Sequence, residues 1–125
     1  MGKIRMFAFF LLLITAFAAP SLTGSSCLNK AEGEEIEALI RTVEDLKDAV
    51  FIRNGKEYTA RIAAEFLRRK WAARAVQVCS AEDFIDKVAP SSSTTGRPHL
   101  IRFPDGREMK AAQFFRSYAG SSSER

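Results

Sequence analysis

The first hydrophobic stretch of the chain runs from Met6 to Ala19 without a charged residue and follows two basic residues, Lys3 and Arg5. Its length of about 14 residues suits the core of a signal peptide and falls short of the ~20 residues that span a bilayer. Ala16-Phe17-Ala18 fits a cleavage site of small residues. The pattern predicts a signal peptide over residues 1–19, with cleavage as late as residue 26 left open and an uncleaved anchor as the alternative.

Apolar residues then recur every three or four positions in two long segments, which is the spacing of an amphipathic helix. The first predicted helix runs from Glu34 to about Asp48, and Thr59 provides an N-cap for a second helix over residues 60–76. Residues 20–33, which precede the first helix, are rich in serine, threonine and glycine. This composition predicts a flexible tether.

Two shorter helices are predicted further along the chain. Ser80 and Asp83 have the spacing of a capping box, and Pro90 ends the helix that they start. A final helix is predicted over residues 111–118, where aromatic residues supply the apolar side. Residues 120–125 are polar and predict a frayed tail.

The segments between these helices predict two β-hairpins. Val50–Arg53 is β-branched and aromatic, and Asn54-Gly55 favours a two-residue turn into a second strand at 56–58. The order of strand, glycine turn, glutamate and helix recurs from residue 99 onward, which favours two hairpins pairing in one antiparallel sheet with the helices on one face. We therefore predict an α+β fold, with a small single domain over residues 34–119 in which three to four helices pack on two short β-hairpins.

Charge becomes nearly balanced once the signal peptide is removed. The full chain has 19 basic and 15 acidic residues, and 17 basic residues remain without Lys3 and Arg5. This excess is too small to indicate nucleic-acid binding. The second helix differs, because its five cations accompany a single acid, Glu65. They form a candidate contact for an anionic component of the envelope, or alternatively a solvated face: Arg61, Arg68, Arg69, Lys70 and Arg74.

The chain has two cysteines, Cys27 and Cys79. Two thiols in an oxidising compartment usually pair, so we predict a disulfide between them. Lipid attachment at Cys27 is the alternative, although the residues just before it lack the branched apolar residue of a lipoprotein signal. An enzymatic interpretation would combine His99, the only histidine, with a thiolate at Cys79 or with a carboxylate pair such as Glu57 and Glu108.

The polar loop before the second hairpin is a candidate ligand site. Loops of serine, threonine and glycine either bind ligands or form constrained turns, and the sequence leaves both interpretations open. The candidate residues are Ser92, Ser93, Gly96 and His99. One histidine and two cysteines without ligand spacing predict no metal site, and no motif predicts a cofactor.

Several short motifs follow one another along the chain: Phe51-Ile52-Arg53-Asn54-Gly55 with Tyr58, Leu67-Arg68 with Lys70, Ala81-Glu82-Asp83-Phe84-Ile85, Ser92 and Ser93 with Gly96 and Pro98, Leu100-Ile101-Arg102, and Pro104-Asp105-Gly106-Arg107-Glu108. In this order they resemble the YfeK-like family of uncharacterised exported bacterial proteins, which is known only as a domain of unknown function, and the likeness covers about residues 36–118. The resemblance implies an envelope or periplasmic location and brings no activity, ligand or catalytic residue. Phe66 stands where many relatives have a histidine, and His99 where an aromatic residue, usually tyrosine, is common.

Together these features predict an exported, periplasmic protein that is a non-enzymatic binding or accessory module of the bacterial envelope. The expected partner is an anionic envelope component or another periplasmic protein, and no nucleic acid. The alternative is a small envelope enzyme that uses Cys79 or a carboxylate pair with His99. The small number of catalytic residue types favours the binding module.

Overall fold

The computed structural model describes residues 27–122 of the chain. The predicted signal peptide, its cleavage site and residues 20–26 of the predicted tether lie outside the described residues, as do residues 123–125. The elements in chain order are helix α1 (Lys30–Glu44), strands β1 (Val50–Arg53) and β2 (Lys56–Thr59), helix α2 (Ala60–Ala73), the 3-10 turn η1 (Ala75–Gln77), helix α3 (Ala81–Lys87), strands β3 (Leu100–Arg102) and β4 (Glu108–Lys110), and helix α4 (Ala111–Ser122).

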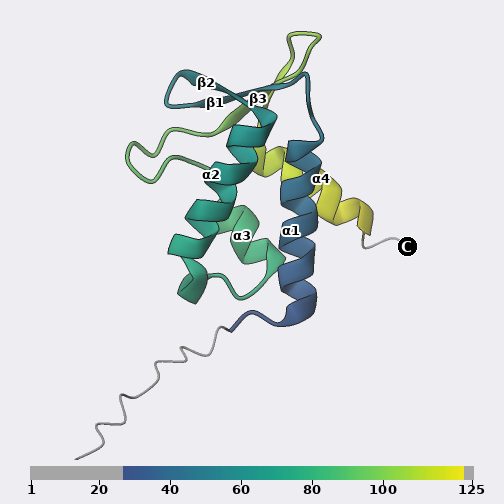
Figure 1. Ribbon diagram of the computed structural model, residues 1–125, viewed down its shortest axis with the longest axis vertical. Coiled ribbons are helices and arrows are strands. Elements are labelled where there is room, and N and C mark those ends of the chain that lie inside the picture. Colours follow the sequence, from purple (N-terminus) through teal and green to yellow (C-terminus); the bar gives the residue numbers. More distant parts are fainter. Residues whose placement is uncertain (1–26, 123–125) are drawn as a thin grey trace, which may run out of the picture.

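The four strands form one antiparallel sheet in the order β2-β1-β3-β4, and the helices gather on one side of it (Figure 1). Asn54 and Gly55 turn the first hairpin with φ angles of 54° and 75°, as a tight two-residue turn requires. Phe51 pairs with Tyr58 on one side and with Ile101 on the other, and all three lie on the face that the helices cover. The predicted α+β fold with two hairpins is confirmed.

The core lies between this sheet face and the helices. The rings of Phe84 and Phe115 meet edge to face with their centroids 5.8 Å apart, and Trp71 contacts Phe84 in the same way at 6.2 Å. Such aromatic pairs stabilise a core beyond the area that they bury. The largest fully buried side chains are Phe84, Phe115, Ile36, Ile40, Ile101, Val43, Val78 and Val88.

The start of α1 is fastened to the start of α3. A disulfide joins Cys27 to Cys79, as predicted, with the two Cα atoms 4.9 Å apart. The Glu32 carboxylate accepts a hydrogen bond from the backbone N–H of Ala81 at 2.7 Å, and Ser80 Oγ accepts one from Asp83 N at 3.1 Å, which is the predicted N-cap. Within residues 27–122, no helix is long and apolar enough to cross a membrane.

Several helix boundaries differ from the predicted ones. Helix α1 begins at Lys30, four residues earlier than predicted, because the Asn29 side chain accepts a hydrogen bond from Glu32 N at 2.9 Å and caps it. Residues 30–33 of the predicted tether are therefore helical. Helix α1 ends earlier, at Glu44, and α4 continues through Gly120 to Ser122 because a glycine weakens a helix by only about 1 kcal/mol.

Candidate functional site

A cavity of about 290 Å³ lies between α2, the sheet and the loop that precedes β3. Its walls are mostly apolar. We call it the basic cavity, because three of its polar lining residues are arginine or lysine and none of the described residues that line it is acidic. The apolar lining consists of Val43, Phe51, Ile52, Tyr58, Ala63, Phe66, Leu67, Leu100, Ala111 and Phe115, and the polar lining of Arg53, Arg69, Lys70, Ser93 and His99.

The Phe66 ring is the centre of a small aromatic and cationic group. Helix α2 starts directly after β2, and Thr59 Oγ1 caps it by accepting from Ile62 N. This direct connection places Phe66 against the first hairpin, where its ring meets Tyr58 edge to face at 4.9 Å. The guanidinium carbons of Arg53 and Arg69 lie over the same ring, 5.4 and 5.2 Å from its centroid. These cation–π contacts hold two positive charges at the cavity wall.

Lys70 carries its charge at a half-buried position. Its Nζ donates a hydrogen bond to the backbone carbonyl of Ser91 in the loop. Burial, followed by the positive charges of Arg74 and Arg53, lowers the pKa of Lys70 from the usual 10.5 to about 8. The ammonium group is therefore mostly charged at pH 7, although its surroundings favour the neutral amine.

The His99 ring lies nearby with a fixed tautomer. Its Nδ1 is 3.1 Å from the carbonyl oxygen of Ala89, and because a carbonyl only accepts, Nδ1 carries the proton. Nε2 is then an acceptor, is buried, and has no hydrogen-bond partner among the described residues. Burial, followed by the charge of Lys70, lowers the pKa of His99 to about 4, with a smaller effect from Arg53 in the same direction. The imidazole is therefore neutral at pH 7.

The loop residues predicted as a ligand site have separate roles. Ser93 and His99 line the basic cavity. Ser92 is almost completely buried, and its Oγ accepts from Asn54 Nδ2 at 3.0 Å, which fastens the loop to the first hairpin. Gly96 adopts a φ of 71° at a turn, a conformation that residues with side chains rarely adopt.

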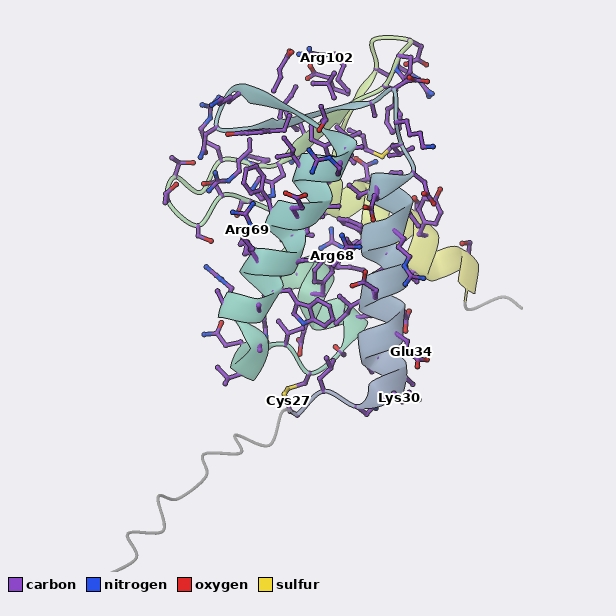
Figure 2. All side chains as sticks on the ribbon, viewed as in Figure 1. Cys27, Lys30, Glu34, Arg68, Arg69 and Arg102 are labelled. Atoms are coloured by element: carbon purple, nitrogen blue, oxygen red, sulfur yellow. A yellow bond between two sulfur atoms is a disulfide. The ribbon has the colours of Figure 1, made fainter. Side chains whose placement is uncertain are left out.

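The five predicted cations of α2 do not form one surface. Arg69 and Lys70 line the basic cavity. Arg68 points toward α1, where its Nη2 lies 2.6 Å from Glu37 and 3.1 Å from Glu44, and Figure 2 shows Arg68 and Arg69 on different sides of α2. These ion pairs join the two helices, so Arg68 has a structural role.

The other two cations of the predicted set also lie outside the cavity lining. Arg61 pairs with Glu65 at 2.7 Å on the exposed side of α2. Arg74 donates hydrogen bonds to the backbone carbonyl of Lys87 at 3.4 Å and to Ser93 Oγ at 3.2 Å. Of the five predicted cations, two therefore line the cavity, and the other three lie outside its lining and contact other parts of the protein.

Sequence reasoning did not select Arg53 as a site residue. Alternate residues of a strand share a face, so Arg53 is on the same face as the buried Phe51. A cation at a core-facing position of a strand is unusual, because burying a charge is unfavourable unless it is compensated. A cation two positions after the buried Phe51 is therefore the sequence signal that could have identified Arg53 as a site residue.

The residues of the enzymatic alternative are not assembled. Cys79 is in the disulfide and so provides no thiolate, which corrects that part of the alternative. Glu57 and Glu108 both contact Arg102, at 2.5 and 3.1 Å, on the sheet face away from the helices, where Figure 2 shows Arg102. Within the described part of the chain, no three histidine, cysteine or acidic residues gather as metal ligands.

Comparison with known proteins places the chain in a family. The model of a family of unknown function, DUF5329, matches residues 30–121, which is most of the chain. This chain belongs to the DUF5329 family. It is also 39% identical over 72 residues to a protein named uncharacterized protein YfeK from Salmonella typhimurium. That match covers 58% of this chain and 60% of the relative, and no solved structure matches.

The match confirms the predicted resemblance to the YfeK-like family and brings no activity to this DUF5329 domain. Phe66 and His99 both line the basic cavity.

Proposed function

We propose that this DUF5329 domain is an exported, periplasmic and non-enzymatic binding module, and that its basic cavity holds a small organic anion with an apolar part. The observation that carries this proposal is the composition of the cavity. Apolar walls are combined there with Arg53, Arg69 and Lys70, and none of the described lining residues is acidic. An anion would be attracted to these charges, while its apolar part would be removed from water.

The size of the cavity supports a ligand that consists of a ring and a short acidic arm. Its volume is about 290 Å³, roughly twice that of a ~150 Å³ apolar cavity that accommodates benzene. The carboxylate suits the cations, because guanidinium groups bind it with two parallel hydrogen bonds. A compound of the size and charge of 3-phenylpropanoate meets both conditions.

Two features of the chain support export. The uncharged stretch from Met6 to Ala19 after two basic residues is typical of a signal peptide. The disulfide between Cys27 and Cys79 is of a kind that persists mainly in oxidising compartments. A binding role without catalysis is supported by the small number of catalytic residue types in the sequence, which has one histidine and two cysteines.

The proposal is tested by calorimetric titration of the disulfide-bonded protein with 3-phenylpropanoate. Two compounds of the same shape serve as ligand controls, the neutral 3-phenylpropanamide and the cationic 3-phenylpropylamine. We expect saturable binding of the acid at concentrations up to about 10 mM and at least tenfold weaker binding of the amide and the amine. Equal binding of acid and amide, or no saturable binding of the acid, would overturn the proposal.

Helix α2 offers a matched pair of variants for the same titration. Arg69 lines the cavity and Arg61 does not, yet both side chains are 70% exposed and both pair with Glu65. We expect Arg69→Met to weaken binding of 3-phenylpropanoate about fivefold to tenfold and Arg61→Met to leave it unchanged. Equal losses in the two variants would mean that net charge, and not the cavity, attracts the acid.

A further inference from the structure

The cations of the basic cavity have little acidic compensation. Arg53 and Lys70 form no ion pair with any carboxylate in residues 27–122; the Arg53 guanidinium contacts an aromatic ring, and Lys70 Nζ donates to a backbone carbonyl. Arg69 pairs only with Glu65, at 3.8 Å and with its side chain 70% exposed, where an ion pair is weak. Three positive side chains therefore line one cavity with little opposite charge from the protein.

A fourth cation lies at the edge of the cavity. Arg74 Nη2 donates a hydrogen bond to Ser93 Oγ at 3.2 Å, and Ser93 lines the cavity. Among the described residues, Arg74 has no carboxylate partner either. The positive charges of Arg74 and Arg53 both disfavour the ammonium form of Lys70. A single negative charge would compensate only part of this excess, so the site favours a ligand group that carries two.

We infer that the acidic group recognised by the basic cavity is a dianionic phosphomonoester attached to an apolar part of the ligand. The inference rests on the proposed function and makes it more specific, because it names the acidic group. A phosphomonoester carries a charge of about −1.5 to −2 at pH 7 and three oxygens that accept hydrogen bonds strongly. A carboxylate carries one charge and has two oxygens.

The donors of the cavity come from two elements. Arg53 ends β1, whereas Arg69 and Lys70 lie on α2, and none of the three residues is fully buried. The guanidinium carbons of the two arginines lie 5.4 and 5.2 Å from the centroid of the Phe66 ring, which itself belongs to the apolar wall. A tetrahedral phosphate beside this ring can accept from all three side chains, while the apolar part of the ligand contacts the walls.

The test compares matched compounds by calorimetric titration at pH 8 in a buffer without phosphate. At this pH 2-phenylethyl phosphate is a dianion, 2-phenylethyl sulfate has the same shape and one charge, and benzylmalonate carries two charges on two planar carboxylates. We expect the phosphate to bind about tenfold more tightly than the sulfate and about threefold more tightly than benzylmalonate. Equal binding of phosphate and sulfate, or benzylmalonate binding as tightly as the phosphate, would overturn the inference.

Inorganic phosphate distinguishes an organic ligand from the free ion. It has the charges and no apolar part, so we expect it to bind at least tenfold more weakly than 2-phenylethyl phosphate. Equal binding of the two would contradict an organic phosphomonoester as the ligand.

A pair of variants tests the role of the cavity cations. Arg53→Met should weaken binding of the phosphate about tenfold and of the sulfate about threefold, because the doubly charged group loses more attraction. Arg61→Met, which removes a cation outside the cavity lining, should change neither affinity by more than about twofold. Equal losses for phosphate and sulfate in Arg53→Met would refute recognition of the second charge.

Proton uptake tests the contact with Lys70 in the wild-type protein and so does not depend on a variant that folds. Lys70 has a pKa of about 8 and is half protonated at pH 8, whereas His99, with a pKa of about 4, is neutral there. A dianion beside Lys70 favours the ammonium form, so we expect uptake of about 0.3–0.5 proton per bound phosphate, measured in buffers of different ionisation enthalpy. No uptake in wild type, or the same uptake in Lys70→Met, would overturn the inference.

The outcomes separate the two proposals. If 3-phenylpropanoate binds more tightly than its amide, but 2-phenylethyl phosphate and sulfate bind equally, the cavity binds organic anions and the inference alone fails. If neither 3-phenylpropanoate nor the phosphate binds, the proposed function itself fails.

Discussion

Replacement of Lys70 by methionine separates a functional role of this residue from a structural one. Methionine retains the length of the apolar stem and removes the ammonium group. The stem packs in the cavity wall, while the charge lies in surroundings that favour the neutral amine. If Lys70 is present for binding, its removal should weaken binding of an anion and at the same time stabilise the folded protein.

The sign and size of the stability effect follow from the pKa. Burial and the charges of Arg74 and Arg53 lower the pKa of Lys70 from 10.5 to about 8, so between these values the unfolded chain binds more protons than the folded one. The destabilising effect of Lys70 is therefore complete below pH 8 and disappears above pH 10.5. This pKa difference corresponds to about 3 kcal/mol for a fully buried group, and partial solvation of Lys70 reduces the expected gain to about 1–2 kcal/mol.

The assay is urea unfolding of wild type and Lys70→Met at pH 7 and again near pH 10.5, followed by circular dichroism. We expect the midpoint of the variant to be higher by about 1 M urea at pH 7, and this difference to shrink at the higher pH. Lys47→Met, at an exposed turn position outside the cavity, is the control and should leave the midpoint unchanged. A lower midpoint for Lys70→Met at pH 7 would refute the reasoning, because the bond to Ser91 would then dominate.

Two further predictions concern the scaffold. The disulfide between Cys27 and Cys79 spans 52 positions, so replacing both cysteines by serine should lower the free energy of unfolding by up to about 4 kcal/mol, measured by urea unfolding; an unchanged midpoint would contradict it. Arg68→Met should lower it by about 1 kcal/mol, because two ion pairs between α1 and α2 are lost. The affinity for 3-phenylpropanoate should stay unchanged, and Arg61→Met, which loses an exposed pair, should show a smaller loss of stability.

The fold could be predicted from the sequence because its determinants are local. The three- and four-residue spacing of apolar positions identified the helices, and Asn54-Gly55 identified the first hairpin. The ends of the helices were predicted less accurately, because the position of a helix end depends on single capping contacts. The Asn29 cap was overlooked, and α2 ends at Ala73, three residues before the predicted end.

The cavity could be predicted only in part, because its lining comes from segments far apart in the chain. Arg69, Lys70, Ser93 and His99 were among the candidates, but nothing local shows that α2 and the loop share one cavity. Adjacent helix residues point about 100° apart, so neighbouring cations of α2 separate between the α1 interface and the cavity. Only tertiary contacts reveal which cation goes to which side.

The repeated strand–turn–helix pattern predicted from the sequence is present in the structure. In the structure each helix starts directly after its second strand, so Ala60 at the start of α2 corresponds to Ala111 at the start of α4. Both hairpins belong to one sheet, and α2 and α4 pack on the same face of it (Figure 1).

The correspondence of Ala60 with Ala111 shows how the two helices of the repeat differ beside the cavity. Three and four positions after their first residues, α2 has Ala63 and Ala64, whereas α4 has Phe114 and Phe115. The two rings fill the corner between α4 and the sheet, and both are almost completely buried. Ala63 lines the cavity beside α2, whereas Ala64 is fully buried outside its lining, and Phe115 borders the same cavity from the α4 side. Local rules of folding are broken at this place, with charges on a core-facing position and a buried acceptor without a partner, and such departures are expected where a protein binds its ligand.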